Sequence, residues 1–222
     1  MSDPKEHERV NDILLGPVER PLLRWLAAHL PHRITPDALT LIGVGGALTI
    51  LVGYTLTRFS PWYLWLATIG FVINWFGDSL DGTVARYRDI ERPKYGFFVD
   101  HTVDAFGQLL MFVGLGLSPY FTFGVAMLAL VGYLLMSIYV YVDTYVTGRF
   151  KISYGKLGPT EMRLIAILLN TFIFFFGVRT LETAWGAVAL LDIPAAIIAA
   201  ALIGLFCYST VTRALELRPE GK

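Results

Sequence analysis

Cysteine and charged residues are both scarce in this chain of 222 residues, and each scarcity excludes a class of protein. The single cysteine, Cys207, lies in an apolar run, so an internal disulfide and a thiolate metal site are excluded. Charged residues make up 16% of the chain, against about a quarter in ordinary soluble domains. The 18 basic residues balance the 18 acidic ones and form no stripe with interleaved aromatics, so no nucleic-acid partner is expected.

Apolar residues, in contrast, are abundant at 55% of the chain, and the mean hydropathy is +0.57. A helical crossing of a bilayer needs about 20 mainly apolar residues. Six segments meet this requirement: Asp37–Thr57, Pro61–Leu80, Tyr95–Leu117, Tyr120–Val146, Thr160–Val178 and Ile193–Thr212. Because lipid cannot satisfy backbone polar groups, we predict an all-α integral membrane protein, a bundle of six transmembrane helices.

Two further segments contain apolar residues but lie outside the six predicted transmembrane helices. From Pro21 to Leu30, apolar residues recur at helical spacing, which predicts an N-terminal interfacial helix on the membrane surface, or one that packs on the bundle. The segment Arg179–Asp192 is expected to lie along the membrane surface or to lengthen the sixth helix. The predicted organisation is an N-terminal segment at 1–36, a six-helix domain at 37–213 and a tail at 214–222.

The basic residues predict the orientation of the bundle. Of the 18 Lys and Arg residues, all but Arg58 and Arg179 lie in the terminal segments or in the connections after the second and fourth helices. The positive-inside rule therefore places both termini and these connections in the cytoplasm.

Four aspartates gather near the cytoplasmic ends of the second and third predicted helices. Asp78 and Asp81 are three residues apart, and Asp100 and Asp104 are four apart, so each pair shares a helix face. An antiparallel helical hairpin brings the two pairs together at similar depth. The sequence therefore predicts one cluster of four carboxylates.

Such a cluster needs a positive partner. An aspartate at the centre of a membrane helix costs about 2.5–3.5 kcal/mol on insertion scales, and two carboxylates about 5 Å apart repel by roughly 3 kcal/mol at an effective dielectric near 20. Arg86 can pair with only one of the four. A hard divalent cation takes oxygen ligands, and four carboxylates can hold two ions, so we predict a metal site.

The residues between the two pairs favour a phosphate-bearing ligand. Gly82, Ala85 and Gly96 leave little side chain beside the carboxylates, although glycines are also common where membrane helices pack. Arg86 carries a planar fork suited to phosphate. A metal site, an arginine and a helix face of small residues together indicate a site for a diphosphate.

The order D-x-x-D-G-x-x-A-R followed by G-x-x-x-D-x-x-x-D resembles the signature of the CDP-alcohol phosphotransferase family. Its eight fixed positions are filled by Asp78, Asp81, Gly82, Ala85, Arg86, Gly96, Asp100 and Asp104. The segment Thr35-Pro36-Asp37 resembles the start of that family's first helix, and the six-helix layout extends the likeness over most of the chain.

The resemblance implies a metal-dependent enzyme of phospholipid synthesis. A substituted phosphate would move from a CDP-alcohol to an acceptor alcohol, with release of CMP and with Mg²⁺ or Mn²⁺, two ions, as cofactor. Asp78, Asp81 and Asp100 would ligate metal, and Asp104 would ligate metal or act as general base. Gly82, Ala85, Arg86 and Gly96 would line the CDP site. A homodimer is also implied, with Trp62, Tyr63 and Trp65 either in the contact or in the interfacial aromatic belt.

The sequence shares features with two branches of the family that use different substrates. His101, directly after Asp100, and the segment Gly158-Pro159-Thr160-Glu161 are similar to the choline and ethanolamine phosphotransferase branch. His101 is then a second candidate for proton transfer, or else a structural histidine. The short chain favours CDP-diacylglycerol as donor, and acceptor binding is assigned to Arg149, Lys156, Glu161 and Arg163, although cytoplasmic loops carry such cations in any case.

Two rival classes remain. An intramembrane prenyltransferase also clusters aspartates, but in two separated repeats, and we find no internal repeat in this chain. A cation-coupled transporter also places acids in the membrane, but such sites lie at the midplane, whereas these acids lie near one end.

Overall fold

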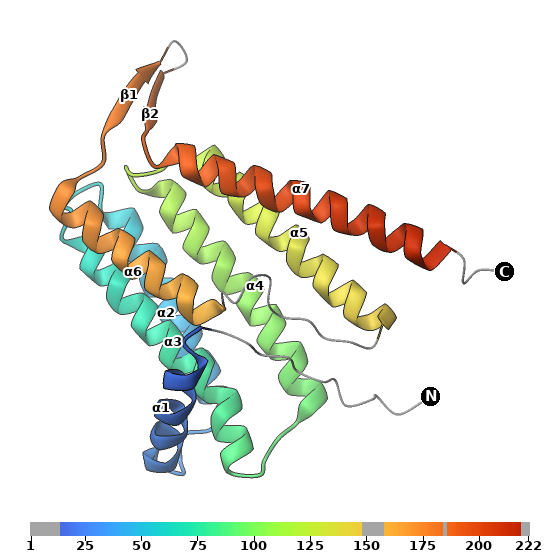
Figure 1. The fold of residues 1–222 in the computed structure, drawn as a ribbon. Coiled ribbons are helices and arrows are strands. Elements are labelled where there is room, and N and C mark those ends of the chain that lie inside the picture. Colours follow the sequence, from blue (N-terminus) through green and yellow to red (C-terminus); the bar gives the residue numbers. More distant parts are fainter. Residues whose placement is uncertain (1–13, 148–157, 184–185, 219–222) are drawn as a thin grey trace.

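The structure, a computed structural model, describes residues 14–147, 158–183 and 186–218 and forms from them seven helices and one short hairpin (Figure 1). The helices are α1 Gly16–His29, α2 Pro36–Leu56, α3 Tyr63–Tyr87, α4 Pro93–Leu117, α5 Phe123–Thr147, α6 Pro159–Phe176 and α7 Asp192–Leu217. The strands β1 Thr180–Thr183 and β2 Gly186–Ala189 pair antiparallel. The helical class predicted for the bundle is confirmed.

Each of the six predicted apolar segments lies on one of the helices α2 to α7. Four of these helices, α2, α5, α6 and α7, are long and apolar enough to cross a membrane. They expose large apolar side chains such as Phe175 and Ile197, which water would not stabilise. The chain is therefore an integral membrane protein. The helices α3 and α4 are 25 residues long but carry the four aspartates, and their crossing of the membrane stays a prediction.

The segment Arg179–Asp192 forms the hairpin and does not lengthen the sixth predicted helix, which is α7, so that expectation was wrong, while its position along the membrane surface stays a prediction. Gly177 has a positive φ of 68° and ends α6, and the chain then turns into the hairpin. The buried carboxylate of Asp192 accepts hydrogen bonds from the backbone N–H of Ala189 and from the N–H and hydroxyl of Thr122. These bonds fix the start of α7 beside the α4–α5 turn.

The helices α2 and α3 approach each other closely through glycines. A Cβ built on Gly46 would lie 2.3 Å from the backbone N of Asn74, and one on Gly77 would lie 2.3 Å from the backbone N of Gly43. Small residues allow such backbone contact between membrane helices. This contact sets the depth and rotation of the end of α3, where Asp78 and Asp81 lie.

One face of α1 packs on the bundle and the other is exposed. Glu19 is buried, and its Oε1 accepts hydrogen bonds from Trp75 Nε1 of α3 and from Thr160 Oγ1 of α6, both at 2.7 Å. Leu23 and Ala27 complete this face. The exposed face is apolar, with Val18, Leu22 and Trp25 in a row. The packing expectation thus holds for one face, and contact of the other with the membrane stays a prediction.

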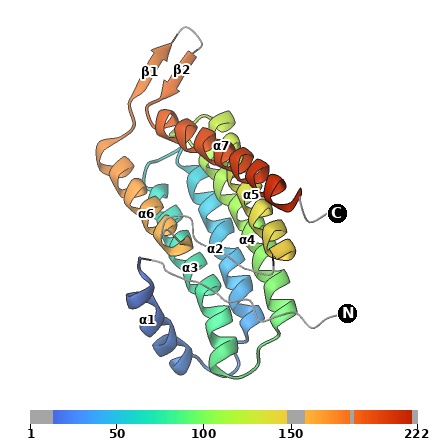
Figure 2. The same cartoon turned by 45° about the vertical axis from the view of Figure 1, so that its right-hand side comes forward.

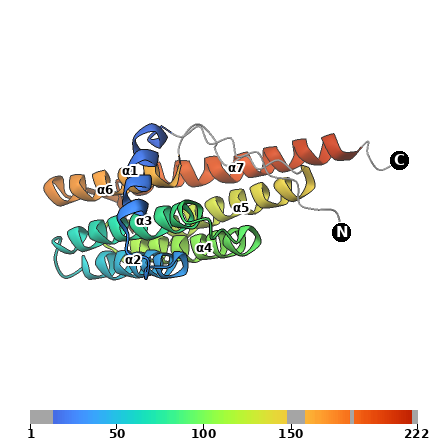
Figure 3. The ribbon, with the colours of Figure 1, turned by 90° about the horizontal axis from the view of Figure 1, so that it is seen from below.

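The arrangement has two distinct ends. Figures 1 and 2 show the hairpin at one end, and α1 at the other, beside the end of α3 and the start of α4. α2 lies beside α3 and α4, α6 packs on α3, and α7 packs along α5 (Figure 3). The residues of the aspartate motif lie at the α1 end.

Candidate active site

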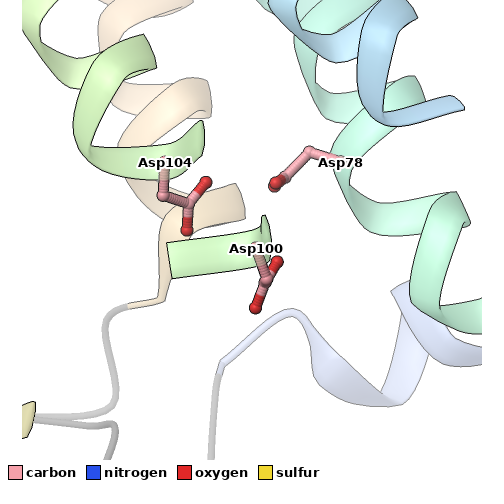
Figure 4. Close-up of side chains that lie close together, drawn as sticks. All are labelled: Asp78, Asp100 and Asp104. Carbon is pink, nitrogen blue, oxygen red and sulfur yellow. The ribbon is translucent and has the colours of Figure 1, made fainter. Parts of the chain in front are cut away.

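Three of the four aspartates meet between α3 and α4. Asp78, Asp100 and Asp104 each offer a carboxylate oxygen, and these oxygens lie within 4.8 Å of one another (Figure 4). The antiparallel pairing of α3 and α4 causes this, because residues near the end of one helix face residues near the start of the next. All three side chains are partly buried.

Asp81 is outside this group of three. Its Oδ2 accepts a hydrogen bond from Thr40 Oγ1 of α2 at 2.7 Å, and its Oδ1 accepts one from the backbone N–H of Gly82 at 2.5 Å. The carboxylate is thus held on the α2 side of α3. Thr40 was not among the predicted site residues. Its position one turn after Pro36, at the start of the first apolar segment, is the only sequence signal for it.

An arginine from α6 completes the cluster. Arg163 Nη2 lies 2.5 Å from Asp78 Oδ2, and Arg163 Nε donates to Asn74 Oδ1 at 2.8 Å. Asn74 in turn donates to the carbonyl of Gly43 at 2.9 Å. Arg163 is 9% exposed, so this ion pair is shielded from water and joins α2, α3 and α6. The sequence assigned Arg163 to acceptor binding, whereas the structure gives it Asp78 as a partner.

The residues expected to line a CDP site lie at the exposed end of the helices. Arg86 lies over Gly82, where a Cβ would be 3.2 Å from Arg86 Nη1, and its Nη2 is 3.4 Å from Thr83 Oγ1. At Gly96 a Cβ would meet nothing within 4 Å. Ala85 is partly buried in the last turns of α3. Gly82 therefore makes room for Arg86, and Gly96 keeps open space beside the start of α4.

His101 points along its own helix towards α5. Its Nδ1 lies 2.8 Å from the carbonyl oxygen of Phe97 and 3.6 Å from Asp100 Oδ2. The ring stacks on Phe97 at 4.1 Å and meets Tyr141 edge-on at 4.8 Å. Donation from Nδ1 to the carbonyl would leave Nε2 as the basic nitrogen in the neutral ring.

Two of the predicted acceptor-binding residues, Arg149 and Lys156, lie outside the described residues. Glu161 is buried at the start of α6, where it accepts hydrogen bonds from the backbone N–H groups of Gly158 and Leu15. This matches the role that an acidic residue has in a first helical turn. It also attaches α1 to α6.

A pocket opens beside the acids, between α2, α3, α4 and the first turn of α6. Its lining residues are Thr40, Gly43, Val44, Ala47, Asn74, Asp78, Val103, Asp104, Gly107, Gln108, Met111 and Arg163. Oxygen donors from three carboxylates fit a hard divalent cation, and the single positive charge of Arg163 does not balance them. The three carboxylates can hold metal, and a small pocket lies beside them.

Most of the chain matches a known protein family. A sequence model of the family described as CDP-alcohol phosphatidyltransferase matches residues 33–203, which includes every described residue of the site. The match begins just before α2 and ends within α7.

Among similar proteins, cholinephosphotransferase 1 of Danio rerio is 27% identical over 172 residues, which are 71% of this chain and 43% of the relative. A phosphatidylinositol phosphate synthase of Cutibacterium acnes is 35% identical over 104 residues, 47% of this chain and 44% of the relative. An archaetidylinositol phosphate synthase of Pyrococcus horikoshii is 32% identical over 123 residues, 54% of this chain and 61% of the relative. The chain thus spans less than two thirds of each relative.

Proposed function

Because the chain belongs to the CDP-alcohol phosphatidyltransferase family, we propose that it moves a substituted phosphate from a CDP-alcohol to an acceptor alcohol and releases CMP. The observation that carries this proposal is the meeting of Asp78, Asp100 and Asp104 beside a pocket. A diphosphate brings negative charge to a site that is already acidic, so divalent metal is required. We propose that two ions of Mg²⁺ or Mn²⁺ are bound, because four carboxylates can hold two ions.

In this proposal the three clustered carboxylates and Asp81 hold the metal. When bound, the metal neutralises phosphate charge and makes the phosphorus distal to cytidine a better electrophile. The oxygen of the acceptor alcohol forms a bond to that phosphorus, and the bond from phosphorus to the bridging oxygen breaks, so CMP leaves. Asp104 takes the proton of the acceptor hydroxyl, and His101 Nε2 is the second candidate for this proton. Gly82, Ala85, Arg86 and Gly96 receive the CDP portion.

Two substrate pairs follow from the comparisons. CDP-diacylglycerol as donor, with a small polar alcohol such as inositol phosphate or glycerol phosphate as acceptor, is our first choice, and the phosphatidylinositol phosphate synthase relative supports it. CDP-choline or CDP-ethanolamine with diacylglycerol is the second, because the cholinephosphotransferases match a larger share of this chain. Arg149, Lys156, Glu161 and Arg163 remain the residues proposed for the acceptor side. Glu161 would act indirectly, by holding the start of α6, and Arg163 by holding the carboxylate of Asp78.

We further propose that six helices cross the membrane, that both termini and the site face the cytoplasm, and that two copies form a homodimer. The basic residues of the α1 end support the orientation. The exposed apolar row of α1 would then lie in the membrane surface. Trp62 and Trp65 pack on Phe174 of α6 at 4.9 and 5.5 Å, which fits a position in the interfacial belt.

The first prediction is CMP release that depends on metal. Purified protein in mixed micelles should form CMP from CDP-diacylglycerol with one member of a panel of labelled acceptors, or from CDP-choline with diacylglycerol. Chelation by EDTA should reduce the rate to background, and Mg²⁺ or Mn²⁺ should restore it. Undiminished CMP release in EDTA would contradict the metal site. Ion-coupled uptake by vesicles, with no CMP from any pair, would favour a transporter.

The second prediction concerns Thr40, which holds Asp81 from α2. Thr40→Val keeps the shape but removes the hydroxyl, so we expect Mn²⁺ affinity to fall by about 10–100-fold, as for other residues that orient a metal ligand. Thr40→Ser keeps the hydroxyl and should retain most of the affinity. Titration with Mn²⁺ followed by electron paramagnetic resonance measures this without turnover. Equal affinity in the Val and Ser variants would show that the hydrogen bond does not orient Asp81 for metal.

A further inference from the structure

A buried glutamate of α1 bridges the two helices that carry the ion pair of the site. Glu19 Oε1 accepts hydrogen bonds from Trp75 Nε1 of α3 and from Thr160 Oγ1 of α6, both at 2.7 Å. A weaker donor, Ser79 Oγ of α3, lies 3.4 Å from the same oxygen. Figure 2 shows α1 beside α3 and near the start of α6. A single oxygen atom of α1 thus ties α3 to α6.

This bridge lies within one helical turn of the ion pair between Arg163 and Asp78. Trp75 precedes Asp78 by three residues on α3, and Thr160 precedes Arg163 by three residues on α6. The place where the guanidinium meets the carboxylate therefore depends on how the first turn of α6 is held against α3. The bridge through Glu19 fixes that turn.

The carboxylate of Glu19 has neutral donors and no cation beside it. The residue is 8% exposed, and in the part of the chain that the structure describes no Lys, Arg or His forms an ion pair with it. A buried carboxylate costs free energy unless it accepts hydrogen bonds. Packing alone would be served by an apolar residue such as Leu23, one turn later on the same face of α1. The side chain of Glu19 therefore serves to bridge two helices through its oxygen.

We propose that Glu19 is a positioning residue of the metal site, because its bond to Thr160 holds the start of α6. Arg163, within a turn of Thr160, then keeps the carboxylate of Asp78 in the orientation that a metal ion requires. The inference rests on the metal site of the proposed function but on neither substrate pair. The residues that match the family begin at 33, so α1 lies outside them and adds its own support to the site.

The test measures Mn²⁺ affinity of the full chain by electron paramagnetic resonance, without substrate. Glu19→Leu removes the bridge, and we expect the affinity to fall by about 3- to 10-fold, less than for a residue that contacts a metal ligand directly. Glu19→Gln keeps Oε1 and should retain most of the native affinity. Thr160→Val removes the bridge from the α6 side and should reproduce the loss. Because both variants break the same bond, the double variant should be little weaker than either single one.

Leu23→Ala is the matched control. Leu23 is buried on the packed face of α1, so alanine loosens the packing of this helix but leaves the bridge through Glu19 in place. The variant should have a lower melting temperature and the native Mn²⁺ affinity.

Native Mn²⁺ affinity in Glu19→Leu would overturn the proposal, and so would an equal loss of affinity in Leu23→Ala. Should Glu19→Leu not fold, Thr160→Val decides in its place, because it removes the same hydrogen bond and keeps the shape of the side chain. Absence of CMP from every substrate pair would overturn the proposed function instead, since Mn²⁺ binding is measured without turnover.

Discussion

Replacing Asp100 by asparagine is expected to reduce metal-dependent CMP release by more than about 100-fold. Asparagine keeps the shape of the side chain but removes the negative charge from a group of three carboxylates whose oxygens lie within 4.8 Å of one another. Loss of a residue that merely orients a metal ligand costs about 10–100-fold, so loss of a direct ligand should cost more. Mn²⁺ affinity, measured without substrate, should fall with the rate.

Asp89→Asn is the matched control for this change. Asp89 is exposed in the α3–α4 connection, where it adopts a positive φ of 54° that asparagine tolerates equally well. The same loss of charge, eleven residues before Asp100, should leave both the rate and the Mn²⁺ affinity near the native values. Native activity in Asp100→Asn would refute the assignment of Asp100 to the metal, and so would an equal loss in Asp89→Asn.

A second large effect is expected from a single methyl group on α2. In Gly46→Ala the new Cβ would lie 2.3 Å from the backbone N of Asn74, so α2 and α3 must move apart. Overpacking of this kind costs about 1–3 kcal/mol. For a protein of this size that lowers the melting temperature by roughly 3–10 °C. Because Thr40 and Asp81 face each other across the same two helices, Mn²⁺ affinity should fall as well.

The neighbouring glycine provides the control. A Cβ at Gly45 would meet nothing within 4 Å, and alanine is the better helix former, by about 1 kcal/mol at most. Gly45→Ala should therefore keep or slightly raise the melting temperature, which can be followed by tryptophan fluorescence in detergent. Equal melting temperatures for the two variants would show that α2 and α3 are not packed as closely as Gly46 requires.

The sequence predicted the helices well because apolar runs of about 20 residues bounded by turns leave the backbone few alternatives in lipid. The sequence did not predict the hairpin of the segment Arg179–Asp192, because that structure depends on distant partners. Asp192 binds Thr122, 70 residues away, and no local pattern indicates that contact. The ionic partner of the aspartates was unpredictable for the same reason, since Arg163 is 85 residues from Asp78.

By itself, the sequence determined that the protein lies in a membrane and that two pairs of aspartates at helical spacing lie near the ends of two successive helices. Composition and periodicity are local properties, and two antiparallel helices follow from them. Only the tertiary structure decided which aspartates meet, which one Thr40 holds, and that Arg163 and Gln108 face the pocket. Those choices depend on how four helices are rotated against each other, and side-chain packing between distant segments sets that rotation.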